Sequence, residues 1–420
     1  MFDIDKWQEI WITIGRNKLR SLLTAFGVFW GILMLTLLLG VSNGLSNGMK
    51  SSVQGIATNS CFFFSGTTSE PYAGFKKGRR WDIRLSDIDL IRSQVEGVRD
   101  VAPVVFGGRG TDNVMYGDKL GSFNVRGNGP ELMRIEEQNM LYGRYINEID
   151  ISQKRKVCVI GKNVFSAFFK EGTNPCGLLI RCNGQYYRIV GVTKGVSNNI
   201  SLGGRSDDMV VLPITTMQQL YNQGDVIHFF GVRAHDHYDI TKLEENIKDI
   251  LKSRHQISPT DPQAVVSINI GEMFKTFMYL FLGISILTWI VGVGTLLAGA
   301  IGVSNIMLVS VRERTKEIGI RRALGAKPSN IISQIMTESL VLTALAGFVG
   351  FTLGVGILAL IDQIIANAPA DSDIFLQQLM IDFKVGISAA AILLFFGLLA
   401  GLLPAMRAMQ IKPIEALSEE

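Results

Sequence analysis

Four long stretches without a charged residue dominate the hydrophobic pattern of the chain. Each holds the roughly 20 mainly apolar residues that a helix needs to cross the hydrocarbon of a bilayer. The pattern therefore predicts an α-helical membrane protein with four transmembrane helices, at residues 21–43, 275–311, 339–361 and 385–406.

Two of these helices are expected to extend beyond the bilayer. The charge-free window 276–311 is too long for one crossing at a rise of about 1.5 Å per residue. An apolar stripe of Leu45, Met49, Val53 and Ile56 continues the first helix at helical spacing. Both are predicted to form stalks; the alternative is that they tilt or break at their glycines.

Between the first two spans, residues 44–274 change to short apolar runs punctuated by Gly, Asn and Pro. This pattern is typical of a large α+β domain, with enough residues for two subdomains. The segment 183–195, NGQYYRIVGVTKG, has the turn and alternation of a β-hairpin. Strands are predicted at residues 101–106, 157–160, 178–182, 186–192, 209–212 and 228–233, and helices at 86–95, 162–169, 215–221 and 240–254.

Basic residues orient the chain, because Lys and Arg stay on the cytoplasmic side of a membrane. They gather in residues 1–20, which have the pattern of an amphipathic interfacial helix, and in the loop 312–338. The short loop 362–384 is instead acidic, as expected outside. We therefore expect both termini, including the tail 407–420, in the cytoplasm, and the large domain 44–274 outside the cytoplasm.

The composition supports this class of protein. Of the 420 residues, 47% are hydrophobic and only 19% are charged, with four cysteines and a net charge of +4. These values exclude intrinsic disorder and a disulfide-dense secreted domain, and they give no case for nucleic-acid binding. No charged residue lies in the apolar cores of the spans, which argues against an ion-coupled transporter.

Small residues recur at helix-packing spacing in three of the spans. Such rows let helix backbones approach closely in lipid, although Gly and Ala are also simply common in membrane helices. The predicted packing residues are Gly294, Ala298 and Gly302, then Ala346, Gly350 and Gly354, then Gly397 and Gly401.

The sequence offers no candidate active site. It contains no GxxxxGK motif followed by Ser or Thr, no HExxH and no CxxC, so we expect a non-catalytic chain with no cofactor, and ATP and Mg²⁺ on a partner. His235 and His237 could share one face of a strand as metal ligands, but surface histidines are the preferred interpretation. Cys176 and Cys182 could form a disulfide or remain buried reduced thiols. The second alternative follows if the run between them is extended, because its ends are then too far apart to bond.

The loop 310–340, SVRERTKEIGIRRALGAKPSNIISQIMTESL, is the most informative stretch. Its charges alternate in sign, and Gly325 ends a first short helix before a second begins near Ser329. The apolar side of the first helix is predicted to consist of Ile318, Ile320, Ala323 and Leu324. From the residues alone, an amphipathic helix and a solvated connecting loop are both compatible with this pattern.

This loop resembles the signature of the FtsX-like permease family, in its MacB-type branch. NKLRSLLTAFGVFWG (17–31), VCVIGKNVFSAFF (157–169) and LLPAMRAMQIKPIEAL (402–417) are similar to the family in order and spacing. The resemblance implies a four-helix permease with a MacB-like periplasmic core, which dimerises with a second copy or a paralogue and pairs with a separate P-loop ATPase. By position, the ATPase-coupling residues would be Arg312, Glu313, Arg314, Glu317, Ile318, Gly319, Arg321, Arg322, Ala323, Gly325 and Ala326.

The function implied by the resemblance is mechanotransmission in an ABC export system. The ATPase would drive the external domain, with a periplasmic adaptor and an outer-membrane channel, for efflux of a drug, a peptide or another periplasmic substrate. The alternatives are an FtsX-like regulator of a cell-wall hydrolase and a lipoprotein-releasing permease. The sequence does not identify the substrate.

Overall fold

The computed structural model describes residues 18–109, 113–196, 204–367, 379 and 383–410. The predicted amino-terminal interfacial helix and most of the carboxyl-terminal tail lie outside these residues. The chain divides into two compact units: a helical unit of Met1–Met49 with Tyr279–Glu420, and a sheet-rich unit of Lys50–Met278.

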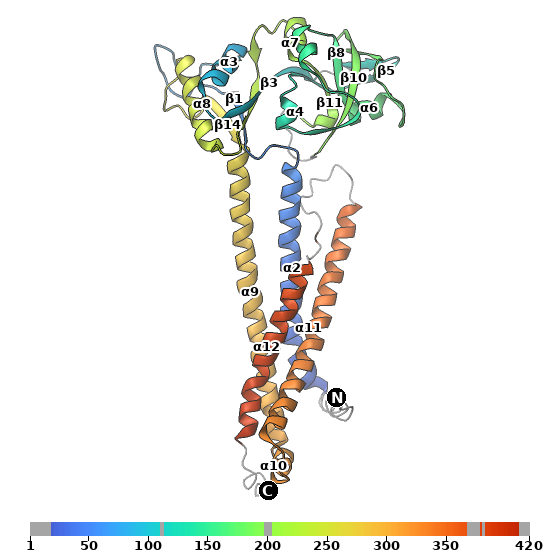
Figure 1. Ribbon diagram of the computed structural model, residues 1–420, viewed down its shortest axis with the longest axis vertical. Coiled ribbons are helices and arrows are strands. Elements are labelled where there is room, and N and C mark those ends of the chain that lie inside the picture. The colour runs from blue at the N-terminus through green and yellow to red at the C-terminus, as the bar shows by residue number, and fades with distance from the viewer. Residues whose placement is uncertain (1–17, 110–112, 197–203, 368–378, 380–382, 411–420) are drawn as a thin grey trace. The chain divides into compact units, whose positions relative to one another are not determined.

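Four long helices and one short helix make up the membrane part of the chain (Figure 1). All four long helices are long and apolar enough to cross a membrane. The 44-residue helix α9 is unbroken and about 66 Å long, so the expectation of an over-long second span is confirmed. The helices are α2 (Lys18–Val53), α9 (Ile270–Glu313), α10 (Thr315–Ala323), α11 (Pro328–Ala366) and α12 (Phe383–Met409).

The first helix also continues past its predicted span, through three of the four residues of the apolar stripe. It ends at Val53, and Ile56 instead forms a β-bridge with Glu136. Gly55 between them has a φ of +88°, a left-handed conformation that glycine adopts without strain. The predicted helical position of Ile56 is therefore wrong.

Glycines on α11 and α12 lie where helices of the helical unit come close together. A Cβ atom on Gly350 would stand 2.6 Å from the carbonyl oxygen of Phe29 in α2, and one on Gly354 would stand 2.7 Å from Thr36. On α12, Gly401 faces Ser339 and Gly397 faces Thr343 of α11. Ala346, one turn from Gly350, is buried.

The row predicted on α9 makes no such contacts within the described chain. Cβ atoms on Gly294 and Gly302 would meet open space, and Ala298 is exposed. Their role in helix packing therefore stays a prediction, and within the described chain they contact no other helix. The close approach to α2 lies one position further along, where a Cβ atom on Gly299 would stand 3.0 Å from the backbone of Gly27 and one on Gly27 would stand 3.3 Å from that of Gly299. Helical spacing shows which small residues share a face of α9, but it does not show which face contacts α2.

The sheet-rich unit is built on one path of hydrogen-bonded strands. Within the described residues the order is β14-β1-β13-β3-β6-β11-β8-β10-β9-β4-β5, with β7 beside β10, and β2 pairs β12 separately. Pairs β6–β11 and β8–β10 are parallel, and the other described pairs are antiparallel. The strands are β1 (Ser60–Ser65), β2 (Ile83–Arg84), β3 (Val98–Arg109), β4 (Val114–Tyr116), β5 (Lys119–Gly121), β6 (Asn124–Asn128), β7 (Gln138–Gly143), β8 (Val157–Gly161), β9 (Leu179–Cys182), β10 (Gln185–Gly195), β11 (Met209–Pro213), β12 (Val226–Ile227), β13 (Phe229–Ala234) and β14 (Val265–Asn269).

Short helices and a 3₁₀ turn accompany these strands. They are α3 (Leu85–Gln94), α4 (Leu132–Ile135), α5 (Glu148–Ser152), α6 (Lys162–Phe168), the turn Ser206–Asp208, α7 (Ile214–Leu220) and α8 (Ile240–Arg254). In α8 the side chains of Ile240, Leu243, Ile247 and Leu251 form one buried face, and the Asp239 carboxylate caps the amino terminus. All ten predicted strands and helices have counterparts here. The mixed α and β class is confirmed.

The two expected subdomains correspond to two lobes in Figure 1 that share strand β3. One side of β3 pairs with β13 and the other with β6. The largest cluster of buried hydrophobic side chains takes members from both lobes, including Phe63 and Cys158. The lobes therefore have a joint core rather than one core each.

The predicted hairpin lies at β9 and β10. Asn183 and Gly184 between them have φ values of 45° and 85°, as a tight two-residue turn requires. The sequence analysis missed the central strand β1, whose run of three phenylalanines lacks alternation because both of its faces are buried: Phe63 lies in the largest hydrophobic cluster and Phe62 in a second one. Phe63 of β1 stacks on Phe230 of β13 with ring centroids 5.0 Å apart.

Candidate functional site: the α9–α10–α11 junction

The short helix α10 lies between the ends of two long helices, α9 and α11. It begins one residue after α9 ends and is followed by a tight turn. Gly325 in this turn has a φ of +92°, which ends the helix, and Pro328 occupies the first turn of α11, where its missing N–H costs nothing. The predicted helix, its stop at Gly325 and the second helix are confirmed.

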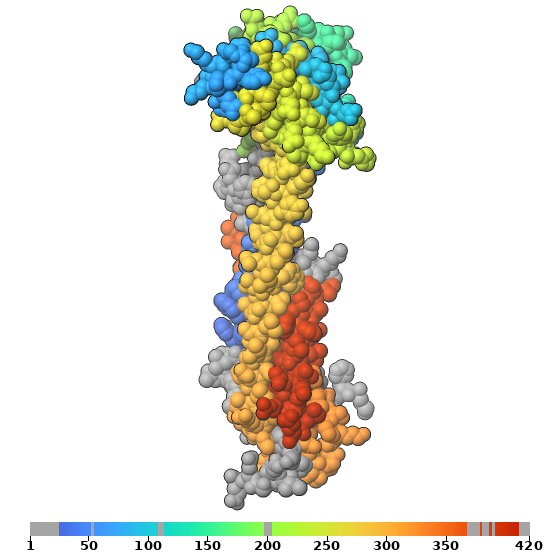
Figure 2. Space-filling view, turned by 90° about the vertical axis from the view of Figure 1, so that its left-hand side faces the viewer, coloured from blue at the N-terminus to red at the C-terminus, as the bar shows by residue number. Residues whose placement is uncertain are grey.

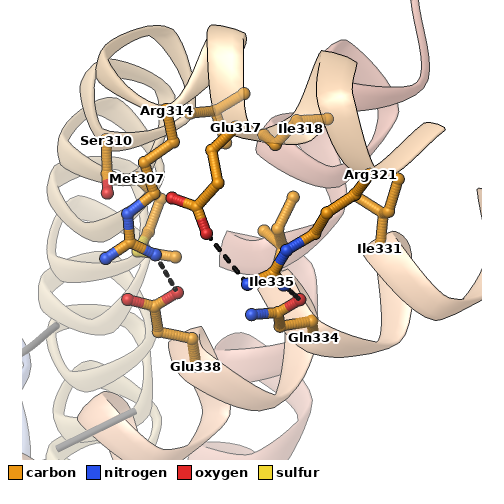
Figure 3. Close-up of a pocket in the computed structure, with 11 residues that line it drawn as sticks. Met307, Ser310, Arg314, Glu317, Ile318, Arg321, Ile331, Gln334, Ile335 and Glu338 are labelled. Carbon is orange, nitrogen blue, oxygen red and sulfur yellow. Dashed lines mark hydrogen bonds and ion pairs between the residues drawn. The ribbon is translucent and has the colours of Figure 1, made fainter. Parts of the chain in front are cut away.

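An apolar contact holds α10 against its neighbours. Ile318 is 9% exposed and belongs to the same buried cluster as Met307 and Val311 of α9 and Ile331 and Ile335 of α11. Figure 3 shows the side chains of Met307, Ile318, Ile331 and Ile335 around a common space. The amphipathic pattern therefore places one face of α10 in the interior of the helical unit.

Two arginines of this segment bind polar groups of the next long helix (Figure 3). The Arg314 guanidinium is paired with Glu338 at 3.5 Å, and the Glu338 side chain is almost fully buried. Arg321 donates to the Gln334 side chain at 3.1 Å and to Glu317 at 2.9 Å. Because a buried carboxylate without a partner is costly, the pair with Arg314 fixes the position of α10 against α11. The sequence analysis did not identify Gln334 and Glu338, which lie at the far end of the loop and on the next helix.

A small cavity of about 30 Å³, large enough for little more than a water molecule, lies among these groups. Its walls carry both arginines and both glutamates. Such a space is too small for a nucleotide or a transported molecule.

The opposite face of α10 is exposed and partly apolar. Leu324 is 83% exposed and Ile320 is 43% exposed, with Lys316, Ala323 and Lys327 exposed around them. The large exposed fraction of Leu324 indicates an interaction surface, because an apolar side chain in water costs free energy unless a partner covers it. We call these five residues the α10 surface.

The predicted coupling residues divide between the two faces. Arg312, Glu313, Glu317, Ala323 and Gly325 are exposed, and Arg314, Arg321, Arg322 and Ala326 are half-buried. Ile318 and Gly319 are buried against the chain's own helices. The surface of these two residues is therefore already covered within the chain. The sequence analysis placed Ile320 and Leu324 on the same apolar side as Ile318. That prediction is wrong, because Ile318 is buried whereas the other two are exposed.

Arg322 has a role inside the chain. It donates to the backbone carbonyl of Met409 at 2.8 Å, at the carboxyl-terminal end of α12. That carbonyl lies in the last turn of a helix, where it lacks an intrahelical donor. A substitution of Arg322 would therefore disturb the helical unit as well as any external contact.

Other reactive groups in the described chain do not assemble into a site. No group of three or more potential metal ligands is found there, and His235 and His237 lie on the surface. Two Gly-x-Ser-x-Gly pentapeptides, at 40–44 and 44–48, match the letters of a nucleophile elbow. Both lie inside α2 rather than at a strand-to-helix turn.

The cysteines are free thiols in the structure. Cys182 is buried and Cys176 is half-buried, without a bond between them. Burial raises the pKa of the Cys182 thiol to about 12, so this side chain stays protonated and unreactive at neutral pH.

The fold and the α9–α10–α11 junction define a multi-pass membrane protein that combines four apolar helices with a large sheet-rich domain. Residues 21–250 match the MacB-like periplasmic core domain, and residues 289–413 match the FtsX-like permease C-terminal domain. The chain therefore belongs to the MacB/FtsX-like ABC permease family, and the resemblance seen in the sequence is confirmed.

Curated relatives carry the name macrolide export ATP-binding/permease protein MacB. The protein of Bdellovibrio bacteriovorus is 27% identical over 418 residues, which cover 97% of this chain and 60% of the relative. That of Acinetobacter baylyi is 27% identical and covers 99% and 60%. The chain thus spans about 60% of the length of these relatives. Among solved structures, the periplasmic region of MacB from Actinobacillus actinomycetemcomitans is similar over 54% of this chain and 95% of that one, at 21% identity and a TM-score of 0.43.

Proposed function

We propose that this protein is the permease subunit of an ATP-driven export system and that the α10 surface binds its ATPase. The single observation that carries the proposal is the division of α10 into two faces. One face is fixed by Ile318 and the Arg314–Glu338 pair, and the other presents Leu324 to solvent. A helix that is anchored on one side and apolar on the other is suited to pass force from a bound subunit into α9 and α11.

Family membership supports an ATPase as the occupant of this surface. The relatives are named as ATP-binding/permease proteins for macrolide export. These 420 residues contain no P-loop motif, so we propose that ATP and Mg²⁺ are bound by the ATPase and not by these residues. Export of a drug, a peptide or another periplasmic substrate is the function that these names favour.

The same proposal assigns a location and further partners. The basic α10 segment would be cytoplasmic, with both termini, and the sheet-rich unit would lie outside the inner membrane. The exposed row of Gly294, Ala298 and Gly302 would contact a second permease copy or a paralogue, because small residues favour close helix contacts in lipid. A periplasmic adaptor and an outer-membrane channel would complete the path.

The Leu324→Glu variant tests the ATPase contact. The full chain would be co-expressed with the ATPase encoded beside it, purified in nanodiscs and assayed for bound ATPase. We expect the amount of ATPase that co-purifies with the variant to fall about tenfold or more, since a charge would enter an apolar contact. Thermal stability should be unchanged, because Leu324 makes little contact with its own chain.

The Leu120→Glu variant is the matched control. Leu120 is 56% exposed on β5 of the sheet-rich unit, so the chemical change is the same at a site away from α10. It should leave ATPase binding intact. Full ATPase recovery with Leu324→Glu would refute the role of the α10 surface. If no ATPase binds even the unaltered chain, the energy source itself is wrong and a regulatory function is favoured.

A further inference from the structure

A basic hairpin, residues 66–80, extends from the sheet-rich unit beside α3 and α8. It contains four basic residues and one acidic residue, Glu70. At its tip, Tyr72 and Phe75 exchange two backbone hydrogen bonds of 3.1 and 2.9 Å across a turn at Ala73 and Gly74. The φ values of 48° and 83° at these positions are those of a tight hairpin turn. In Figure 1 this segment is the blue loop beyond α3 and α8, and it contributes to the blue surface at the upper left of Figure 2.

The base of the hairpin is held firmly by a buried carboxylate. Asp261, in the loop before β14, accepts hydrogen bonds from the backbone N–H and the hydroxyl of Ser69, both at 2.7 Å, and from the N–H of Glu70 at 3.2 Å. Further up, Thr68 and Arg79 pair through their backbones, and the Thr68 hydroxyl accepts from Arg79 at 2.9 Å. The hairpin therefore has one conformation before any partner binds.

One of the four cations is used to stiffen the hairpin. The Arg79 guanidinium lies over the Phe75 ring, 4.1 Å from its centroid, and donates to the backbone carbonyls of His255 and Gln256. This contact presents the aromatic tip at a fixed angle. Tyr72 and Phe75 are each still 44% exposed.

The other three cations are free to meet a ligand. Lys76, Lys77 and Arg80 are exposed, and in the described part of the chain none of them has an ion pair. The carboxylate of Glu70 accepts from the Thr260 hydroxyl at 2.7 Å and, within the described chain, forms no ion pair with them, so four basic residues and one acidic residue leave the hairpin with a net charge of +3. The hairpin thus combines an exposed aromatic pair with unpaired positive charge.

We propose that the basic hairpin is a docking arm for an acidic surface of a protein partner on the same side of the membrane. Tyrosine and arginine are typical anchors of protein interfaces, and a pre-organised loop loses little entropy on binding. Segments that bind anionic lipid instead carry clusters of about 4–8 basic residues. Three free cations on a rigid hairpin fit a protein surface better than a bilayer.

Site-specific photo-crosslinking tests the docking arm. The full chain would carry the photoreactive residue p-benzoylphenylalanine in place of Tyr72, in native membranes, and a second form would carry it in place of Tyr186, which is 58% exposed on β10. We expect a crosslink to one polypeptide from position 72 only, and mass spectrometry should place it in a segment with net negative charge.

Charge reversal separates specific docking from chance proximity. Lys76→Glu, Lys77→Glu and Arg80→Glu together should lower the crosslink yield at least about tenfold, because like charges would then face each other. Lys76→Arg, Lys77→Arg and Arg80→Lys should preserve it, which controls for folding of the hairpin. A crosslink only to lipid, a target segment without acidic character, an unchanged yield after reversal, or no crosslink from position 72 would each overturn the proposal.

Discussion

At the residue scale, Asp261 joins two distant parts of the sheet-rich unit. Its carboxylate is fully buried and also accepts from the N–H groups of Gln263 and Ala264, at 2.9 and 3.1 Å. Burial by itself would raise the pKa of Asp261, but hydrogen bonds from the Ser69 hydroxyl and from backbone amides lower it to about 2. The ionised form is therefore stabilised in the folded chain.

Replacing Asp261 with Asn tests this anchor. Asn accepts fewer and weaker hydrogen bonds than a carboxylate, so the hairpin 66–80 should exchange its amide hydrogens faster in the variant. The folded-state pKa lies below the unfolded value near 3.9, so the ionised form contributes stability of about 2 kcal/mol above that value. This contribution should shrink as the pH falls from about 4 towards 2. Hydrogen-exchange mass spectrometry of the full chain measures the first effect, and unfolding at several pH values measures the second.

Two results would contradict this interpretation. One is equal exchange of the hairpin amides in the variant and the unaltered chain at neutral pH. The other is a difference in stability that does not change between about pH 6 and pH 2.

At the scale of elements, the close contact of α11 with α2 depends on a glycine, which has no Cβ atom. The Phe29 carbonyl of α2 occupies the space where a Cβ atom of Gly350 would lie. Dispersion contacts and small interhelical distances provide the association energy of helices in lipid, since lipid is as apolar as leucine. One added methyl group at this position would therefore force two backbones apart.

Gly350→Ala and Gly356→Ala form a matched pair on the same helix. Alanine has a higher intrinsic helix propensity than glycine by about 1 kcal/mol, so both variants gain the same stabilisation of the helix itself. At Gly356 the new methyl group meets open space, whereas at Gly350 it would lie 2.6 Å from an oxygen. Thermal unfolding in detergent should show a lower melting temperature for Gly350→Ala and an unchanged or higher one for Gly356→Ala. Equal melting temperatures would mean that this helix contact does not contribute to stability.

At the scale of the whole molecule, the proposed topology places the α10 surface and the sheet-rich unit on opposite sides of the membrane. The exposed positions Leu324 and Tyr186 report on these two sides. Native thiols interfere little, because Cys61, Cys158 and Cys182 are buried and only Cys176 needs replacement by Ser.

Thiol labelling of the full chain checks this topology. In spheroplasts, a membrane-impermeant maleimide should label Tyr186→Cys at once and Leu324→Cys only after the membrane is permeabilised. Inverted vesicles should give the reverse. Labelling of both positions from one side would refute the proposed orientation, while the helical assignments themselves would stand.

The sequence by itself determined the membrane class, the turn at Gly325 and most strands and helices. These features depend on local properties: a run of apolar residues long enough for a bilayer, a glycine that accepts positive φ, and the 3.6- and 2-residue periods of side-chain burial. The family resemblance was also carried by local motifs.

Only the tertiary structure decided which surfaces face inward. It buried Ile318 and exposed Leu324, set the contact of α9 with α2 at Gly299, and placed β1 between two distant strands. It also brought Asp261 to a hairpin that lies 192 residues earlier in the chain. The physical reason is that period and composition limit which residues share a face, whereas the partner of each face is set by contacts between segments far apart in sequence.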